Sequence, residues 1–167
     1  MIPVDSRPPP GIVGISCGEL ARYSAFTASF AGLAAPAGTQ IVIACGYDTA
    51  YNSNDVIRAL DTFPEAQWVS IWDDDHVFEA DTLLRLLDRE ADVVVPLYTQ
   101  RQPPFFPCAF KEEHEDGSFQ ICRWEDLEGR AGLLPVISAG KGGVLIRRHV
   151  IEELSKRDER EKPEWFE

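Results

Sequence analysis

The sequence lacks the features that mark membrane, secreted and zinc-finger proteins. No apolar run approaches the roughly 20 residues of a membrane-spanning helix. The N-terminal MIPVDSRPPPG has no apolar core behind a basic patch, so it does not resemble a signal peptide. The four cysteines form no CxxC pair and no histidine cluster accompanies them, which argues against a structural zinc site. We therefore expect a cytoplasmic protein with four buried, reduced cysteines: Cys17, Cys45, Cys108 and Cys122.

Positive charge is also scarce. Lys and Arg number 16 against 28 Asp and Glu, so the formal net charge is −12. Such a chain is not expected to bind nucleic acid or anionic membranes by nonspecific attraction. A phosphate-bearing ligand would need a local source of positive charge.

What the sequence does contain is a regular alternation of apolar segments. Its 167 residues, 44% of them hydrophobic, predict one soluble domain with a real core. Short apolar runs at 12–16, 40–44, 68–72 and 93–95 predict strands, and apolar spacings of three and four predict helices over 19–33, 52–62 and 80–89. Asn52 or Ser53 is the expected cap of the middle helix. This alternation indicates an α/β fold with a mostly parallel sheet covered by helices on both faces.

After Tyr98 the pattern changes. A proline and aromatic loop at 102–107 precedes two short segments, 108–111 and 118–123, which flank the polar EEHEDG and predict an antiparallel hairpin. A glycine-rich turn at 137–143 leads into a strand at 144–146 and a helix at 148–155. We therefore expect an extended lead-in over 1–11, a single domain over 12–155 and a charged, solvated tail over 156–167.

Three consecutive aspartates, Asp73, Asp74 and Asp75, end the third apolar run in WVSIWDDDHVF. Ligands of open parallel sheets gather at the carboxyl ends of strands. The alternation along a strand predicts that Asp73 and Asp75 share one side while Asp74 points away. Two carboxylates about 4 Å apart repel by roughly 4 kcal/mol, which a bound cation relieves. Mg²⁺ or Mn²⁺ suits these oxygen ligands and would supply the positive charge that the chain lacks.

Other interpretations of the acidic run remain. It can be a solvated loop, and Glu79 and Asp81 stand where caps of the following helix are expected. An EF-hand fits worse, because it needs glycine where Phe78 stands. The phosphate-loop motif GxxxxGK[ST] is absent from the sequence, and the glycine turn around Lys141 does not match it.

The segment SIWDDDHVFEADTLLRLLDREADVVVPLY resembles the DxD region of glycosyltransferases with the A-type nucleotide-diphospho-sugar fold, the broad family 2-like group. In that group an apolar strand ends in Asp-x-Asp, and an apolar pair, an acidic-capped helix and another strand follow. Asp73 and Asp75 match the motif aspartates, and Asp81 with the following Thr-Leu-Leu matches the helix start. The segment ISAGKGGVLIRR at 137–148 resembles the later glycine turn and strand near the donor sugar and acceptor. The resemblance spans about 12–154 and implies a Rossmann-like sheet.

The resemblance implies a divalent metal, Mn²⁺ or Mg²⁺, and a nucleotide-diphospho-sugar donor, a UDP- or GDP-sugar. Asp75 would ligate the metal that bridges the diphosphate, and Asp73 would contact the ribose or reach the metal through water. Residues at the ends of the first two strands, in the following helix and within the motif would contact the nucleotide: Cys17, Glu19, Asp48, Asn54 and Asp74.

For several residues the sequence is compatible with two roles. Arg101 and Lys141 are candidates for phosphate contacts or ordinary surface cations. His76 is a candidate metal ligand or a bystander. Phe105 and Phe106 line an acceptor groove or simply cover the sheet.

Two departures from the family pattern stand out. Ser53 occupies the position where an arginine often precedes the asparagine of this group. The family's catalytic carboxylate belongs to an acidic motif downstream of the glycine turn, and the chain ends at Trp165-Phe-Glu167, about where that region would begin. We therefore assign no catalytic base and expect a fragment or a truncated relative.

The expected function is metal-dependent transfer of a sugar from a nucleotide-diphosphate donor to an acceptor hydroxyl, or the donor-binding core of such an enzyme. One alternative is a module that binds a nucleotide-sugar without turning it over. A second is a nucleotidyltransferase, although the acidic Cys17-Gly-Glu-Leu lacks the basic glycine-rich loop that would favour it.

Overall fold

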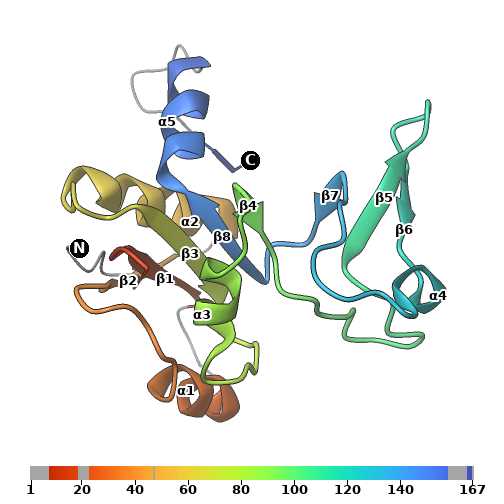
Figure 1. Ribbon diagram of the computed structural model, residues 1–167, viewed down its shortest axis with the longest axis horizontal. Helices are drawn as coiled ribbons and strands as arrows, with labels where there is room; N and C mark the ends of the chain where they lie inside the picture. The colour runs from red at the N-terminus through yellow and green to blue at the C-terminus, as the bar shows by residue number, and fades with distance from the viewer. Residues whose placement is uncertain (1–7, 19–22, 47, 158–164, 167) are drawn as a thin grey trace, which may run out of the picture.

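The computed structural model describes residues 8–18, 23–46, 48–157 and 165–166, and its core is a five-stranded sheet between helices (Figure 1). β1 pairs in parallel with both β2 and β3, whereas β8 pairs antiparallel with both β3 and β4. The spatial order is β2 (Gln40–Cys45), β1 (Ile12–Cys17), β3 (Trp68–Asp73), β8 (Gly143–Arg147) and β4 (Val93–Val94).

The sheet is mixed, because β8 runs against the other four strands, which share one direction. The mostly parallel sheet is thus confirmed, and the antiparallel β8 is a feature that the sequence did not predict. After β4 the chain leaves to form a second, smaller sheet and then returns beside the carboxyl end of β3. There Gly142 O accepts a 3.2 Å hydrogen bond from Asp73 N. Because the chain re-enters at the edge where it left, β8 has to run against β3. The apolar run at 144–146 could not reveal this, since its residues fit a buried strand of either direction.

Helices cover both faces of the sheet, as the sequence predicts. Successive strand residues point to opposite faces and so build two apolar layers. One layer packs under α2 (Thr49–Arg58), η1 (Ala59–Asp61) and α5 (Arg148–Arg157); its buried side chains include Ile12, Val56, Ile71 and Ile151. The other packs under α1 (Ser24–Ala31) and α3 (Thr82–Leu87); its buried side chains include Val13, Phe26, Trp72 and Leu83.

Helix α2 approaches the sheet closely because β1 carries a glycine beneath it. A Cβ built on Gly14 would lie 2.1 Å from Cγ1 of Val56, so a larger residue would push the helix outward. The last turns of α2 therefore pack directly on the middle of β1.

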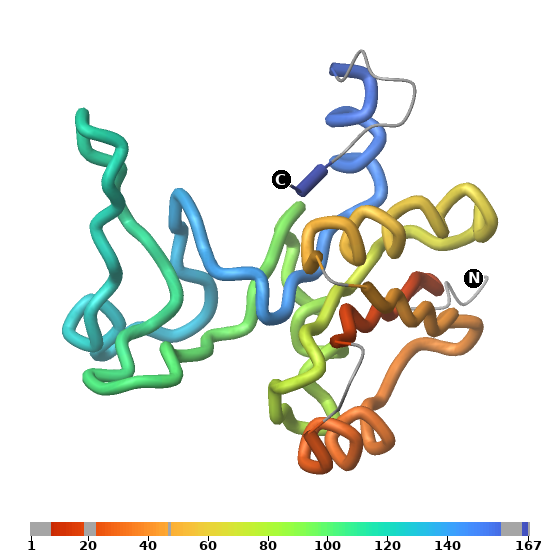
Figure 2. Tube along the Cα trace, turned by 180° about the vertical axis from the view of Figure 1, so that it is seen from behind, coloured from red at the N-terminus to blue at the C-terminus, as the bar shows by residue number. Residues whose placement is uncertain are grey.

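The second sheet stands apart from the core, as Figure 2 shows. Its antiparallel strands lie in the order β6 (Phe119–Ile121), β5 (Ala109–Glu113) and β7 (Ser138–Ala139), and the short helix α4 (Trp124–Leu127) follows β6. The predicted hairpin is confirmed as β5 and β6. Neither β7 nor α4 was expected, because segments of two and four residues are too short to show a periodicity.

The predicted helix starts and thiol environments need correction. Helix α2 begins earlier than expected because Asp48 is its N-cap, with Oδ1 accepting a 2.7 Å hydrogen bond from Ala50 N. Helix α1 begins at Ser24, and residues 19–22 of its predicted first turn lie outside the described residues. Cys17 and Cys122 are buried, Cys108 is half-buried and Cys45 is exposed. The prediction of four buried cysteines is therefore confirmed for Cys17 and Cys122 and wrong for Cys45.

The C-terminal segment contributes to the core, although the sequence predicts a solvated tail. Trp165 and Phe166 are half-buried and pack against the layer beneath α2 and α5. Among the helices that the structure describes, none has the length and apolar character needed to cross a membrane.

Candidate functional site

The carboxyl ends of three parallel strands meet at one edge of the sheet. Cys17 at the end of β1 is in register with Cys45 of β2, and Ser16 is in register with Asp73 of β3. The expectation that the strand ends share an edge is therefore confirmed. The buried Cys17 contributes a backbone carbonyl that accepts a 3.2 Å hydrogen bond from Nδ2 of Asn52 in α2.

The three aspartates make different contacts at this edge. Asp74 Oδ2 accepts a 3.3 Å hydrogen bond from Gly18 N and so ties the motif to the end of β1. Asp73 Oδ1 lies 4.0 Å from Nζ of Lys141. Asp75 Oδ2 forms an ion pair with the guanidinium of Arg101. The motif thus stands between two cations that come from distant parts of the chain.

Arg101 and Lys141 differ in how firmly they are held. Arg101 belongs to the loop after β4 and its side chain is 75% exposed, so its pairing with Asp75 is open to exchange with solvent and ligands. The Lys141 side chain is only 21% exposed. Its Nζ donates hydrogen bonds of 2.9 Å to Thr49 O and 2.5 Å to Ser53 Oγ, both in the first turns of α2.

Burial shifts the acid-base behaviour of this group of charges. It raises the pKa of Asp73, and the positive charge of Lys141 opposes that rise most strongly. Burial likewise lowers the pKa of Lys141, opposed by the charges of Asp73 and Asp48. The charge of each group thus offsets part of the effect of burial on the other, an arrangement that is common at functional sites.

His76 follows the motif and lies against both Asp75 and Tyr98. Its Nε2 is 3.5 Å from Oδ1 of Asp75, and its ring meets the Tyr98 ring edge-on with centroids 5.0 Å apart. Burial lowers the pKa of His76, which favours the neutral imidazole at neutral pH. A neutral imidazole nitrogen can bind a metal, so His76 stays a candidate metal ligand, with a bystander role as the alternative.

Two carboxylate oxygens at the site are buried without a hydrogen-bond partner: Oδ1 of Asp73 and Oδ1 of Asp75. Buried polar atoms in folded proteins are nearly always satisfied, so these oxygens suit an additional ligand. Among the described residues, no three His, Cys, Asp or Glu side chains group to hold a metal by themselves. A site completed by substrate fits better, since Mg²⁺ is commonly held by one or two carboxylates plus phosphate oxygens.

The residues expected near the nucleotide have structural contacts of their own. Asp48 caps α2. The Asn54 side chain donates to Phe166 O at 3.0 Å and accepts from Trp165 N at 2.9 Å and Phe166 N at 3.1 Å. Glu19 lies outside the described residues. The structure thus brings Lys141 and Arg101 to the aspartates, while the Asn54 amide is engaged by the C-terminal segment.

Sequence reasoning missed Tyr98 as part of this site and did not single out Gly142 within the glycine turn. Tyr98 Oη accepts a 2.8 Å hydrogen bond from Gly142 N, and burial raises the pKa of Tyr98 to about 12. A Cβ built on Gly142 would lie 2.1 Å from Nε2 of His76. Tyr98 ends the apolar run VVVPLY, a usable signal for a residue at the end of a strand. Gly142 belongs to the glycine turn that the resemblance links to the donor sugar, but its contact with His76 had no sequence signal, because the two residues are distant in the chain.

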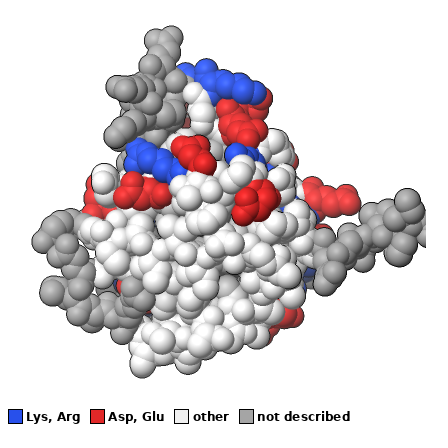
Figure 3. Space-filling model, turned by 90° about the vertical axis from the view of Figure 1, so that its left-hand side faces the viewer, with Lys and Arg blue, Asp and Glu red and all other residues white. Residues whose placement is uncertain are grey.

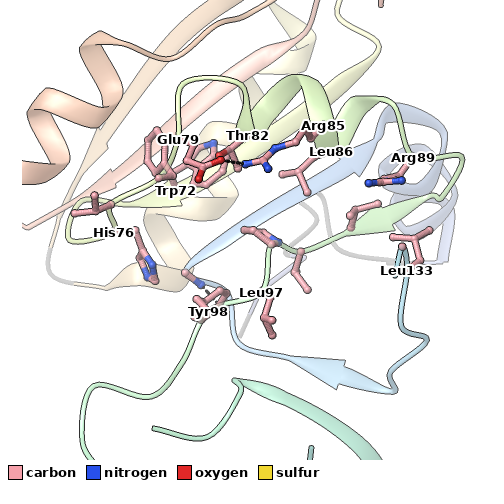
Figure 4. A pocket seen from close by; sticks show the side chains of 17 residues that line it. Trp72, His76, Glu79, Thr82, Arg85, Leu86, Arg89, Leu97, Tyr98 and Leu133 are labelled. Atoms are coloured by element: carbon pink, nitrogen blue, oxygen red, sulfur yellow. Dashed lines mark hydrogen bonds and ion pairs between the residues drawn. The ribbon is translucent and has the colours of Figure 1, made fainter. Parts of the chain in front are cut away.

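A cavity of about 390 Å³ opens beside the motif (Figure 4). His76 and Tyr98 lie at one end of it, and Arg89 and Leu133 at the other. Its wall combines polar and apolar side chains: Glu79, Thr82 and Arg85 line it together with Trp72, Val77, Phe78, Leu86, Val94, Pro96 and Leu97. The volume suits a small-molecule ligand.

Comparisons with known proteins bear on the fold alone. No family model matches the chain, and no curated protein matches it. Solved structures do match, among them the crystal structure of A197 from STIV. It has a TM-score of 0.55 and 13% sequence identity, and the alignment covers 84% of this chain and 67% of that one. This similarity indicates a shared overall fold.

Proposed function

We propose that this chain is a metal-dependent glycosyltransferase, or the donor-binding core of one, which holds a nucleotide-diphospho-sugar at the carboxyl end of β3. The observation that carries the proposal is the pair of buried oxygens on Asp73 and Asp75 that lack a hydrogen-bond partner, beside the cations Lys141 and Arg101. These carboxylates and cations together match a diphosphate that arrives with a divalent ion.

Charge balance supports this ligand class. A diphosphate without a cation would meet a chain of net charge −12 and three adjacent aspartates. Asp73 and Asp75 would hold Mg²⁺ or Mn²⁺, and the ion would stabilise the negative charge on the departing diphosphate. Lys141 would contact a phosphate oxygen while its bonds to Thr49 and Ser53 keep it oriented.

The cavity offers a place for the second substrate. It begins at His76, directly after the motif, and extends toward Arg89 and Leu133. An acceptor in the cavity would reach the donor sugar at the His76 and Tyr98 end. Gly142, which the Tyr98 hydroxyl holds in place, lines this same end of the cavity.

One observation favours the alternative of a binding module without turnover. Glu79 is the carboxylate that lines the cavity among the described residues, and Oε2 of Glu79 pairs with a guanidinium nitrogen of Arg85 at 2.5 Å. A general base must be able to take a proton from the acceptor hydroxyl, and a carboxylate paired in this way is a poor one.

Calorimetric titration of UDP and GDP into the protein, with Mn²⁺ and with EDTA, tests the proposal. We expect binding with Mn²⁺ that is lost in EDTA and weakened at least about tenfold in Asp75→Asn, the effect of 1.4 kcal/mol. Asp61→Asn makes the same charge change at an exposed site on η1 and should bind as the unaltered chain does. Binding of neither nucleotide by the folded protein, or binding indifferent to EDTA and Asp75→Asn, would contradict the proposal.

Release of free UDP or GDP from the corresponding nucleotide-sugar separates the enzyme from the binding module. An enzyme should release the diphosphate slowly to water even without its acceptor, and Asp75→Asn should abolish this release. Tight, metal-dependent binding with no release would leave the binding module as the function.

A further inference from the structure

The chain concentrates its uncharged residues in one continuous segment. Residues 23–47 contain no Asp, Glu, Lys, Arg or His, although 26% of the whole chain is charged. The described part of this segment forms α1, the connection after it and β2. These elements lie together at one side of the sheet, because α1 packs on the β1 layer and β2 is the outermost strand beside β1.

The outermost strand leaves apolar side chains in solvent. Ile41 and Ile43 are in register with Val13 and Ile15 of β1, whose side chains are buried under α1. The helix does not extend over the two isoleucines, which are 61% and 50% exposed. Proteins usually protect an edge strand with charge, proline or a covering segment, and the sequence QIVIAC of β2 contains neither charge nor proline.

The described residues at this edge form an uncharged hollow. A cavity of about 330 Å³ lies between the end of α1 and the start of β2, lined by Phe30, Leu33, Pro36 and Ile41 among others. Figure 3 views this side of the molecule, and a broad part of it carries no charged side chain among the residues described. Exposed apolar area of this kind marks an interaction surface.

We propose that the β2 edge and the adjoining face of α1 form an interface with a second copy of this chain, in which the two β2 strands pair antiparallel across a two-fold axis. Such pairing satisfies the outward backbone groups of both edge strands and joins the two five-stranded sheets into one. The occupant would be the chain itself, so the interface would be isologous.

The distribution of charge favours a second copy of the chain as the binding partner at this face. Two chains of net charge −12 repel each other across most orientations. The neutral face is where they can approach without placing like charges together. A two-fold axis perpendicular to the sheet keeps every side chain on its own face, so Ile41 and Ile43 of one copy would lie beside the same isoleucines of the other.

Sedimentation velocity over a concentration series tests the proposal. We expect a species of twice the 18.7 kDa chain mass at micromolar concentration, the range in which interfaces of ordinary size assemble. Ile43→Glu would place two carboxylates near the two-fold axis and should raise the dissociation constant at least about tenfold, or 1.4 kcal/mol. Ile137→Glu is the matched control, because Ile137 is 55% exposed and lies outside the neutral segment.

Hydrogen exchange locates the contact. The amides of residues 40–45 should exchange more slowly in the unaltered chain than in Ile43→Glu, while circular dichroism shows both folded. A monomer up to about 100 μM, well above the usual range for such interfaces, would overturn the proposal. So would a dimer that Ile43→Glu leaves intact, a dimer without protection of 40–45, or a monomer that binds uncharged lipid vesicles through this face instead.

Discussion

Nζ of Lys141 lies 4.0 Å from Oδ1 of Asp73, close enough for strong attraction but too far for a hydrogen bond. Lys141 donates its hydrogen bonds to the first turns of α2, and Oδ1 of Asp73 accepts no hydrogen bond. The two charges therefore attract without a hydrogen bond, and Oδ1 of Asp73 keeps its capacity to accept one from a ligand.

Removal of the lysine charge should raise the pKa of Asp73 further. Burial raises this pKa and Lys141 is the main opposing influence, so Lys141→Met should shift the carboxyl titration to higher pH. Carbon-detected NMR titration of the Asp carboxyl groups measures the shift. Lys111→Met removes an exposed lysine that pairs with Asp126 on the second sheet, and should leave Asp73 unchanged. An unchanged Asp73 titration in Lys141→Met would show that the lysine does not act on it.

Asp73→Asn should stabilise the fold at neutral pH while it removes a site carboxylate. An acid whose pKa is raised by folding contributes stability below its unfolded pKa, and this is lost as pH rises through the folded value. The charged Asp73 is thus unfavourable at pH 7, and its amide isostere should raise Tm by a few degrees, since ~1 kcal/mol corresponds to about 2–4 °C at this size.

Calorimetric melting curves at several pH values check this prediction. The gain from Asp73→Asn should vanish below the ordinary Asp pKa of 3.8, where the carboxyl is protonated in both states. Asp61→Asn, at an exposed position, should leave Tm unchanged both at pH 7 and below pH 3.8. A lower Tm for Asp73→Asn at pH 7 would mean that the carboxylate stabilises the fold.

A methyl group at Gly142 should disturb the site through His76. The added Cβ would meet Nε2 of His76 at 2.1 Å, so the imidazole or the glycine turn must move. We expect Gly142→Ala to lower the free energy of unfolding by about 1–3 kcal/mol, as overpacking usually does. Gly18→Ala, where no atom lies within 4 Å of the new Cβ, should stay within about 0.5 kcal/mol. Urea unfolding measures both, and equal effects would contradict the predicted contact.

Asn54→Ala should detach the C-terminal segment from α2. The amide makes one hydrogen bond to Phe166 O and accepts from the backbone N–H groups of Trp165 and Phe166. Loss of these bonds should lower the free energy of unfolding by about 1–3 kcal/mol and shift the emission of Trp165 toward that of a solvated indole. Asp55→Ala, a neighbour on the same helix, should leave the emission unchanged, and a detached segment in both variants would contradict the assignment.

The periodicity of the sequence located the strands of the five-stranded sheet within about a residue, because their apolar runs reflect burial in a covered sheet. It also placed Asp73 and Asp75 at the end of the third strand, where the chain turns polar. Helix starts were less accurate. Asn52 and Ser53 have good capping side chains, yet Asn52 bonds to the end of β1 and Ser53 to Thr49 O and Lys141, so Asp48 supplies the cap.

The sequence alone determined the layered α/β plan, the acidic strand end and the shortage of positive charge, since these follow from local pattern and composition. The tertiary structure alone decided the direction of β8 and which cations reach the aspartates. Arg101 lies in the loop by which the chain leaves the core sheet after β4, and Lys141 lies in the turn by which it returns before β8. Both loops lie at the same edge of the sheet, and this brings the two cations to Asp75 and Asp73. Local sequence carries no information on such a return, because a strand direction and a long-range contact are fixed by how the whole chain closes its core.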